Sequence, residues 1–319
     1  MFHVKHSDDN TCFSHPLMKP QKSKVIILTG PTASGKTGLA VQLAKEINGE
    51  IISADSRQVF RDMDIGTGKD LDEYQGVRCH LIDIREAGSE FSVSEFQCEA
   101  LKALEAVSSH GKVPVICGGT GHYIKALLND YNFNTASTNL DYTQNLESLN
   151  RDELYKRIKE IGIWDQHHWE KDSKRRMSRA IEKEINQTAS TNAQNHYQSQ
   201  FIHRIYYLNI ERTQLRKNIK IRLQQRIEEG MITEVELLLK KGITHSRLMR
   251  YGLEYKWISK HLQKEISFEE MFDKLNIEIG RFAKRQMTFI RYMMKSGHTM
   301  IPVDNYTEFN SNALTWLSE

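Results

Sequence analysis

A glycine-rich octapeptide near the start of the chain carries the clearest chemistry in this sequence. Its residues are Gly30, Pro31, Thr32, Ala33, Ser34, Gly35, Lys36 and Thr37, and they match the pattern G-x-x-x-x-G-K-[ST]. In such a loop the backbone amides surround a phosphate, and the helix that follows adds partial positive charge. Lys36 is expected to supply a mobile cation and Thr37 a hydroxyl ligand for Mg²⁺. The motif predicts a di- or triphosphate site and leaves open whether that phosphate is transferred, hydrolysed or expelled.

Two aspartates and a second glycine-rich turn are further candidates, because each follows or ends a short apolar run. In open parallel sheets, ligands bind beyond the carboxyl ends of the strands. Asp55 could accept a proton there, or it could cap the next helix. Asp83 fits a ligand of Mg²⁺-bound water or a structural acid. The turn at 118–121 lets the backbone approach a ligand closely, or it is simply a tight connection between strand and helix.

Apolar runs alternate with helical periodicity in the first 130 residues, and this arrangement must position those candidates. Strands are predicted at 24–29, 50–53, 79–84 and 113–117, and helices at 37–48, 91–109 and 118–128. Strands that alternate with helices predict an α/β fold, in which a parallel sheet is covered on both faces. The phosphate loop would leave the first of these strands.

The pattern changes after residue 129 and becomes mostly helical. Residues 151–187 predict two or three helices, 201–210 a strand, and 212–296 a largely helical stretch that ends in a helix over 268–296. We therefore expect a phosphate-loop sheet core with an inserted, mostly helical domain and a helical C-terminal part. The predicted divisions are a mobile extension (1–23), the core (24–129 and 201–304), the insertion (130–200) and a tail (305–319).

Composition excludes several classes of protein. Hydrophobic residues make up 39% and charged residues 27% of the 319, which is typical of a packed globular core. No window approaches the roughly 20 apolar residues that span a bilayer, and the polar N-terminus lacks the apolar segment of a signal peptide. The four cysteines are scattered without a Cys-x-x-Cys pair, so we expect a cytoplasmic protein without a disulfide scaffold. A monomer is the default, since no long exposed apolar stripe requires a partner.

The net charge of +3 taken alone argues against a nucleic-acid partner, but the charges are segregated. Residues 62–99 carry ten acids and three bases, residues 204–226 seven bases and one acid, and residues 171–183 six bases and two acids. Such segregation points to a polyanion on one face. Ordinary solvated helix faces remain the alternative for any single run.

Several motifs occur together in a fixed order. They are the phosphate loop, the segment 51–60 (IISADSRQVF), 63–69 (MDIGTGK), 118–128 (GGTGHYIKALL) and, near the end, 283–288 (AKRQMT). Together they closely resemble the tRNA dimethylallyltransferase family, over about residues 24 to 304. The resemblance implies a P-loop fold that binds nucleotides or diphosphates, with an inserted helical domain. It also implies transfer of the dimethylallyl group from dimethylallyl diphosphate to N6 of adenosine 37 beside the tRNA anticodon, with Mg²⁺ and with release of diphosphate.

The resemblance also assigns roles to residues. It implies that Thr32, Lys36 and Thr37 with Mg²⁺ offset charge on the leaving diphosphate, and that Asp55 is the general base for N6. The adenine must leave its stack to reach that base. The implied tRNA contacts are Asp55, Ser56, Arg57, Gln58 and Thr120, and in the insertion Arg175, Arg176, Met177, Ser178 and Arg179.

The chain departs from the family pattern at several positions, and an arginine that the family has near residues 138–142 is absent. Arg57 stands where methionine is common, Asn218 where an arginine precedes isoleucine, Glu254 where glycine precedes tyrosine, and Gly280 where an arginine follows threonine. If the missing arginine before Ile219 assists departure of diphosphate, then Arg216, Lys217 or Arg222 substitutes for it.

Three other functions stay open from the sequence. A P-loop small-molecule kinase would use ATP, and it would explain the first 130 residues but not the basic helices. A prenyltransferase for free adenine nucleotides would have less need of the tRNA-binding segments. A tRNA-binding protein that has lost catalysis is disfavoured, because Lys36, Thr37 and Asp55 are intact.

Overall fold

The computed structural model describes residues 22–128, 146, 148–166, 169, 173–189 and 201–319. Residues 1–21 of the predicted N-terminal extension lie outside the described residues, as do 130–145 and 190–200 of the predicted insertion. The chain forms two compact units: residues 92–98 and 122–199 make the second unit, and the remainder makes the first.

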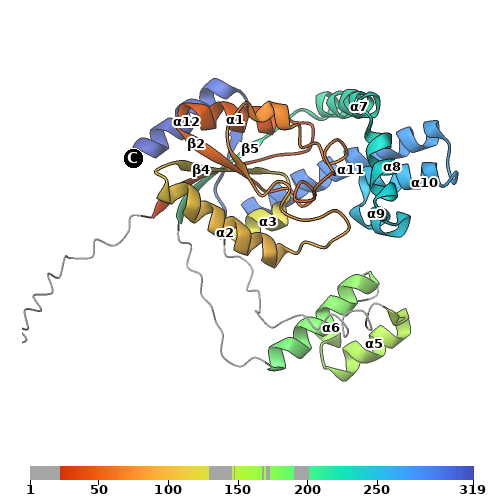
Figure 1. Ribbon diagram of the computed structural model, residues 1–319. Helices are drawn as coiled ribbons and strands as arrows, with labels where there is room; N and C mark the ends of the chain where they lie inside the picture. The colour runs from red at the N-terminus through yellow and green to blue at the C-terminus, as the bar shows by residue number, and fades with distance from the viewer. Residues whose placement is uncertain (1–21, 129–145, 147, 167–168, 170–172, 190–200) are drawn as a thin grey trace, which may run out of the picture. The chain divides into compact units, whose positions relative to one another are not determined.

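A parallel sheet forms the centre of the first unit (Figure 1). Its six described strands lie in the order β3-β2-β4-β1-β5-β6, and each neighbouring pair runs parallel. The strands are β1 (Ser23–Thr29), β2 (Gly49–Ser53), β3 (Cys79–His80), β4 (Val113–Gly118), β5 (Phe201–Leu208) and β6 (Met300–Val303). The predicted α/β class is therefore confirmed.

The strand order places a switch point beside β1. From β1 the chain first builds β2, β3 and β4 on one side of it, and later adds β5 and β6 on the other. Connections leave in opposite directions at such a point, which opens a crevice at the carboxyl edge of the sheet. The loop 30–37 leaves β1 at that edge, and the turn 118–121 leaves the adjacent β4.

Helices α1 (Lys36–Glu46) and α12 (Tyr306–Ser318) cover one face of the sheet (Figure 1). Alternate residues of the strands, such as Ile26 and Leu28, point into this layer because successive side chains of a strand face opposite ways. Phe309 and Trp316 of α12 are buried in the same cluster. The segment 305–319, set apart as a tail in the sequence, is thus part of the core.

A group of helices after β5 packs against the long connection between β2 and β3. These helices are α7 (Arg212–Glu228), α8 (Met231–Lys240), α9 (His245–Tyr251), α10 (Leu253–Leu262) and α11 (Phe268–Lys295). Val59, Phe60 and Met63 of the connection are buried among them. Ser267 and Glu270 form a capping box that fixes the start of α11. The late helices therefore hold the segment that follows Asp55.

The second unit is a small helical body with its own core. It contains most of α3 (Gly121–Leu127), the start of α2 (Val93–Ser109), α5 (Arg151–Glu160), the 3₁₀ turn η2 (Trp164–Gln166) and α6 (Lys174–Ala189). Leu154 and Ile158 of α5 pack with Met177 and Ile181 of α6. The predicted helices within 151–187 are confirmed.

The structure differs from the sequence-based expectations in two strands. The strand expected at 79–84 ends at His80, because Leu81 and Asp83 adopt positive φ angles of 65° and 57° that a strand does not tolerate. The short edge strand β6 was not predicted, since it spans four residues and includes Pro302. None of the helices in the described ranges has the length and apolarity needed to cross a bilayer.

Candidate active site

The phosphate loop forms the sharp turn between β1 and α1. Gly35 has φ of +80°, which favours glycine, and directly precedes the first turn of α1. A Cβ on Gly30 would lie 3.1 Å from the Cβ of Leu208, so β5 leaves little room for a side chain there. The hydroxyl of Ser34 is buried and has no hydrogen-bond partner within the described part of the chain. The loop therefore offers an unpaired donor beside its backbone amides, as a site for an anion does.

Lys36 supplies positive charge to this loop from a desolvated position. Its Nζ lies 3.4 Å from the carbonyl oxygen of Pro31. Burial lowers the pKa of Lys36 below its ordinary value, and the nearby Arg222 and Arg226 lower it further, although Asp55 opposes them. Like charges gathered away from water attract an anion more strongly than exposed ones do. The roles of Lys36 and of the loop in binding a diphosphate stay predictions.

Gln286 of α11 joins the phosphate loop to the turn after β4. The amide of Thr32 donates to its Oε1 at 2.7 Å, and its Nε2 donates to the carbonyl oxygen of Gly119 at 3.0 Å. A Cβ on Gly119 would lie 2.1 Å from Nε2, so a side chain there would displace the Gln286 amide. The sequence places Gln286 within a matched motif, but its partners lie 167 and 254 residues away.

Replacing Gln286 with leucine is expected to weaken binding of inorganic diphosphate to the loop about tenfold. The change leaves the partly buried amide of Thr32 without its acceptor, and such a loss costs on the order of 1–3 kcal/mol. Titration calorimetry with inorganic diphosphate measures this effect. Gln224→Leu on the exposed face of α7 is the control. An equal change in both variants would contradict the role of Gln286 in holding the phosphate loop.

Asp55 lies just beyond the carboxyl end of β2. The backbone amide of Arg57 donates to its Oδ1 at 2.9 Å, and residues 56–59 form turns rather than an α-helix. Asp55 therefore does not cap a helix, which was the alternative open from the sequence. The amide of Ser56 donates to the Thr120 hydroxyl at 3.2 Å, and this ties the turn to the end of β4. Lys36, Arg57 and Arg222 all interact electrostatically with Asp55.

The side chains of Arg57 and Gln58 are held within the protein. Nη1 of Arg57 lies 2.5 Å from Oε2 of Glu254. Gln58 donates to the carbonyl oxygen of Gly68 at 2.9 Å and accepts from the Ser53 hydroxyl, also at 2.9 Å. Their contacts with tRNA stay a prediction. In the structure both side chains brace the segment that carries Asp55.

Arg222 and Arg226 reach the same region from α7. Both pair with Asp70: Arg222 directly, and Arg226 at 3.7 Å. Burial lowers the pKa of Arg222 to about 10, with a further contribution from Arg226. Gly68 has φ of +64°, and a Cβ there would collide with the Arg226 guanidinium. Among the three basic residues considered as substitutes for the missing arginine, Arg222 faces inward.

Two buried charged residues, Lys69 and Glu234, hold the loop 63–70 in place. In the sequence, this loop is recognised only as part of a family motif. Lys69 is fully buried and donates to Asp64 at 2.5 Å, to the Phe60 carbonyl oxygen at 2.7 Å and to Asp83. Glu234 of α8 accepts from three consecutive amides and from the Tyr255 hydroxyl at 2.8 Å. Asp83 is therefore engaged as a structural acid. Glu234 was missed, although a glutamate within an apolar helix is a signal of such a role.

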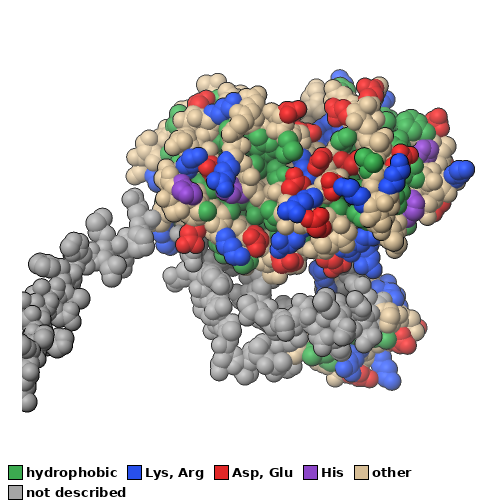
Figure 2. All heavy atoms as spheres, viewed as in Figure 1, with side chains coloured by type: hydrophobic (Ala, Val, Ile, Leu, Met, Phe, Trp, Pro, Cys, Tyr) green, Lys and Arg blue, Asp and Glu red, His purple; other side chains and the backbone are tan. Residues whose placement is uncertain are grey.

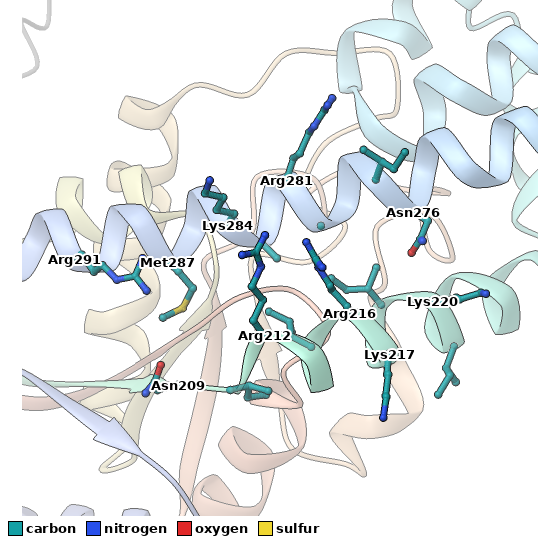
Figure 3. Close-up of a pocket in the computed structure, with 17 residues that line it drawn as sticks. Asn209, Arg212, Arg216, Lys217, Lys220, Asn276, Arg281, Lys284, Met287 and Arg291 are labelled. Carbon is teal, nitrogen blue, oxygen red and sulfur yellow. The ribbon is translucent and has the colours of Figure 1, made fainter.

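A groove of about 980 Å³ runs between α7 and α11 (Figure 3). Seven basic side chains line it: Arg212, Arg216, Lys217, Lys220, Arg281, Lys284 and Arg291. The described residues that line it include no acid, and its floor is apolar, with Leu215, Ala283 and Met287. By contrast, the face of the first unit seen in Figure 2 carries acidic and basic side chains interspersed. The groove is thus suited to a polyanion with apolar parts.

In the second unit, α6 carries the predicted basic segment 175–179. Arg176 and Arg179 are exposed, whereas Met177 and Ser178 are buried. The Ser178 hydroxyl donates to the carbonyl oxygens of Lys174 at 3.0 Å and Leu146 at 3.3 Å. The placement of the Arg175 side chain lies outside the described residues. Among these side chains, those of Arg176 and Arg179 are the ones that an external ligand can reach.

Comparisons with known proteins agree with this geometry. The family described as IPP transferase matches residues 58–293. The tRNA dimethylallyltransferase 1 of Azobacteroides pseudotrichonymphae is 42% identical over 294 residues, which cover 91% of this chain and 95% of that protein. The tRNA dimethylallyltransferase 2 of Syntrophotalea carbinolica is 42% identical over 273 residues, 86% of this chain and 91% of that protein.

Solved structures show the same likeness. The tRNA isopentenylpyrophosphate transferase of Bacillus halodurans has a TM-score of 0.68 and 30% identity, and the match covers 93% of this chain and 97% of that one. A eukaryotic dimethylallyltransferase acting on tRNA shares the fold, with a TM-score of 0.73 and 23% identity over 92% of this chain and 77% of that one. With the family match and these identities over most of its length, the chain belongs to the tRNA dimethylallyltransferase family.

Proposed function

We propose that this protein transfers the dimethylallyl group from dimethylallyl diphosphate to N6 of adenosine 37 in tRNA and releases diphosphate. The observation that carries the proposal is the meeting of a carboxylate and an anion site at one edge of the sheet. Asp55 follows the carboxyl end of β2, the loop with Lys36 follows that of β1, and β4 lies between these strands. The family membership supports the same reaction.

The leaving diphosphate is bound by the phosphate loop. The backbone amides of 33–37, the Ser34 hydroxyl and the ammonium group of Lys36 hold its oxygens, and Arg222 adds a second cation. As the bond between C1 and the diphosphate oxygen breaks, negative charge grows on that oxygen. Groups already fixed in a desolvated site stabilise this charge without reorganising.

Magnesium fits the same loop through the Thr37 hydroxyl, at the start of α1. The described residues gather no cluster of three histidine, cysteine or carboxylate side chains, and Mg²⁺ is commonly held by one or two protein ligands together with substrate phosphates. When bound, the ion would neutralise charge on the diphosphate. Thr37 is the residue that would hold it.

Asp55 acts as the general base in this proposal. N6 of the adenine forms a bond to C1 of the dimethylallyl group while the bond from C1 to oxygen breaks. The proton on N6 passes to the carboxylate of Asp55, and diphosphate leaves with the electron pair. A base that reaches this carboxylate has left its stack. Thr120 and Ser56 border the same turn.

The polyanionic substrate is bound by basic surfaces. In the first unit this surface is the groove between α7 and α11, and in the second unit it is the exposed side of α6 with Arg176 and Arg179. Arginine and lysine side chains neutralise phosphates and release counterions, so affinity falls as salt rises.

Replacing both Arg281 and Lys284 with glutamine is expected to weaken tRNA binding about tenfold or more. The slope of log Kd against log salt should also fall by about 1.5, since roughly 0.7–0.9 is lost with each phosphate contact. Filter binding at several salt concentrations measures both quantities. The exposed Lys102 and Lys240, changed together to glutamine, are the matched control. Equal weakening in both pairs would count against the groove.

Labelled dimethylallyl diphosphate and total tRNA, followed by nucleoside analysis, test the proposed function. Labelled N6-prenyl adenosine in tRNA supports it. Label in free adenine nucleotides but not in tRNA would replace it with the nucleotide prenyltransferase. Phosphate transfer from labelled ATP to a small acceptor, without prenyl transfer, would favour a kinase.

A further inference from the structure

A buried ion pair joins the turn that carries Asp55 to helix α10. Nη1 of Arg57 and Oε2 of Glu254 lie 2.5 Å apart, and the two side chains are 14% and 3% exposed. The guanidinium carbon of Arg57 also lies 5.8 Å from the ring centroid of Phe282 on α11. Arg57 is therefore fixed from two later helices at once.

Arg57 is held in its charged form. Burial alone would lower the pKa of Arg57, but the Glu254 carboxylate, and after it Asp55, raise it above its ordinary value. Two charges taken out of water gain little net stability, while removing one partner leaves the other buried and unpaired. Such a pair is weak evidence for a role in stability. Its location beside Asp55 calls for a different role.

The backbone of Arg57 is the link to the reacting group. Its amide donates to Oδ1 of Asp55 at 2.9 Å, two residues back in the same turn. The guanidinium anchors the far end of the same residue on Glu254, so the ion pair restrains the residue whose amide contacts Asp55. Glu254 thus reaches Asp55 through Arg57, although 199 sequence positions separate them.

We propose that Arg57 and Glu254 are positioning residues for Asp55, and that they act as one unit. This inference rests on the proposed role of Asp55 as general base. The pair fixes the direction of the Asp55 carboxylate. It also places a positive and a negative charge near that carboxylate, so their effects on it oppose each other. The other titratable groups that interact with Asp55 are Lys36 of α1, Cys117 of β4, Tyr74 of η1 (Leu71–Tyr74) and Arg222 of α7.

The test is a double-mutant cycle in the full-length protein, with Arg57→Met, Glu254→Gln and the double variant. Each single variant is expected to lower kcat about 10- to 100-fold, because small misplacements of a reacting group have effects of this size. The KM for dimethylallyl diphosphate should change less than about twofold. The double variant should lose no more than the worse single variant, as expected when two residues act as a unit.

The pH dependence of kcat separates positioning from general loosening. Arg57→Met leaves the Glu254 carboxylate without its counter-charge, so the acid limb should move to higher pH. Glu254→Gln leaves the arginine unbalanced, so the limb should move to lower pH. The double variant removes both charges and should return the limb towards that of the wild type. Arg57→Lys should partly restore kcat.

A matched control is the buried carboxylate at the other end of β2. Glu50 is 4% exposed and pairs with Lys112 and His80, both at 2.7 Å. Glu50→Gln should lower the melting temperature but leave kcat and its pH profile unchanged in the folded protein. Circular dichroism at the assay temperature confirms folding for every variant.

Two results would overturn the inference. One is single variants that resemble Glu50→Gln, with lower melting temperature and normal kcat. The other is independent, additive losses with an unmoved acid limb. Asp55→Asn distinguishes this failure from failure of the proposed base. If Asp55→Asn keeps its transfer activity, the base assignment itself is wrong; if it loses activity while the pair proves neutral, only the positioning role is wrong.

Discussion

The Asp55→Asn variant is expected to transfer the dimethylallyl group about 10²–10⁴-fold more slowly than the wild type, while it binds tRNA almost as well. General bases contribute rate factors of this size. Asparagine keeps an oxygen that can accept from the Arg57 amide, so the turn should keep its geometry. Single-turnover transfer from labelled donor to bound tRNA measures the rate, and filter binding measures the affinity.

The control for this prediction is a carboxylate of the same connection that points away from the site. Asp62 is exposed, pairs with Lys241 at 2.7 Å and has φ of 61°, a conformation that asparagine tolerates. Asp62→Asn should leave the rate unchanged. A loss of tRNA affinity as large as the loss of rate in Asp55→Asn would show that Asp55 binds rather than accepts a proton.

The Arg222→Met variant is expected to lose about 10²–10³-fold in kcat. Removing one fixed group that stabilises developing charge has effects of that order. Arg222 interacts with Lys36 and Asp55 inside the site. Arg226 remains near Asp70, at 3.7 Å, so the loop keeps one partner. Rapid-quench measurement of diphosphate release in single turnovers reports the affected step.

Arg216 on the same helix supplies the comparison. It is exposed and lines the outer groove. Arg216→Met should weaken tRNA binding modestly and leave the chemical step intact. A rate loss in Arg216→Met that equals or exceeds that in Arg222→Met would transfer the role in diphosphate departure to the groove.

The central strand β1 can be predicted from local sequence, but β6 and α12, which complete the core, cannot. The continuous apolar run at 25–28, followed by a glycine-rich turn, predicts a buried strand of a parallel sheet, and β1 forms there with all four side chains buried. β6 adds to the edge of the sheet as a short strand. α12 packs onto the core through Phe309 and Trp316. Both depend on tertiary contacts. A four-residue strand such as β6 carries too little periodicity to be recognised alone.

The candidate site also has a part that the sequence predicts and a part that it does not. The glycines, Lys36 and Thr37 form a local motif, so their position at the end of a strand could be predicted from spacing. Gln286, Glu234 and Glu254 complete the site from helices far along the chain. A side chain on a helix does not specify its distant partner by its type. The role of Asp55 likewise could not be separated from capping until the turn at 56–59 was seen.

The pairing of β1 with β5 also governs the order in which the protein can assemble during synthesis. Ser23 lies beside Phe201 in the sheet. At ribosomal rates of about 5–20 residues per second, β1 waits roughly 10 to 35 seconds for this neighbour. Gln286 and Glu254 emerge later still. Pairings so distant in sequence are slow to form. During most of its synthesis the nascent chain therefore has the phosphate loop but lacks the contacts of Gln286 and the ion pair between Arg57 and Glu254. It should acquire activity only near the end of translation.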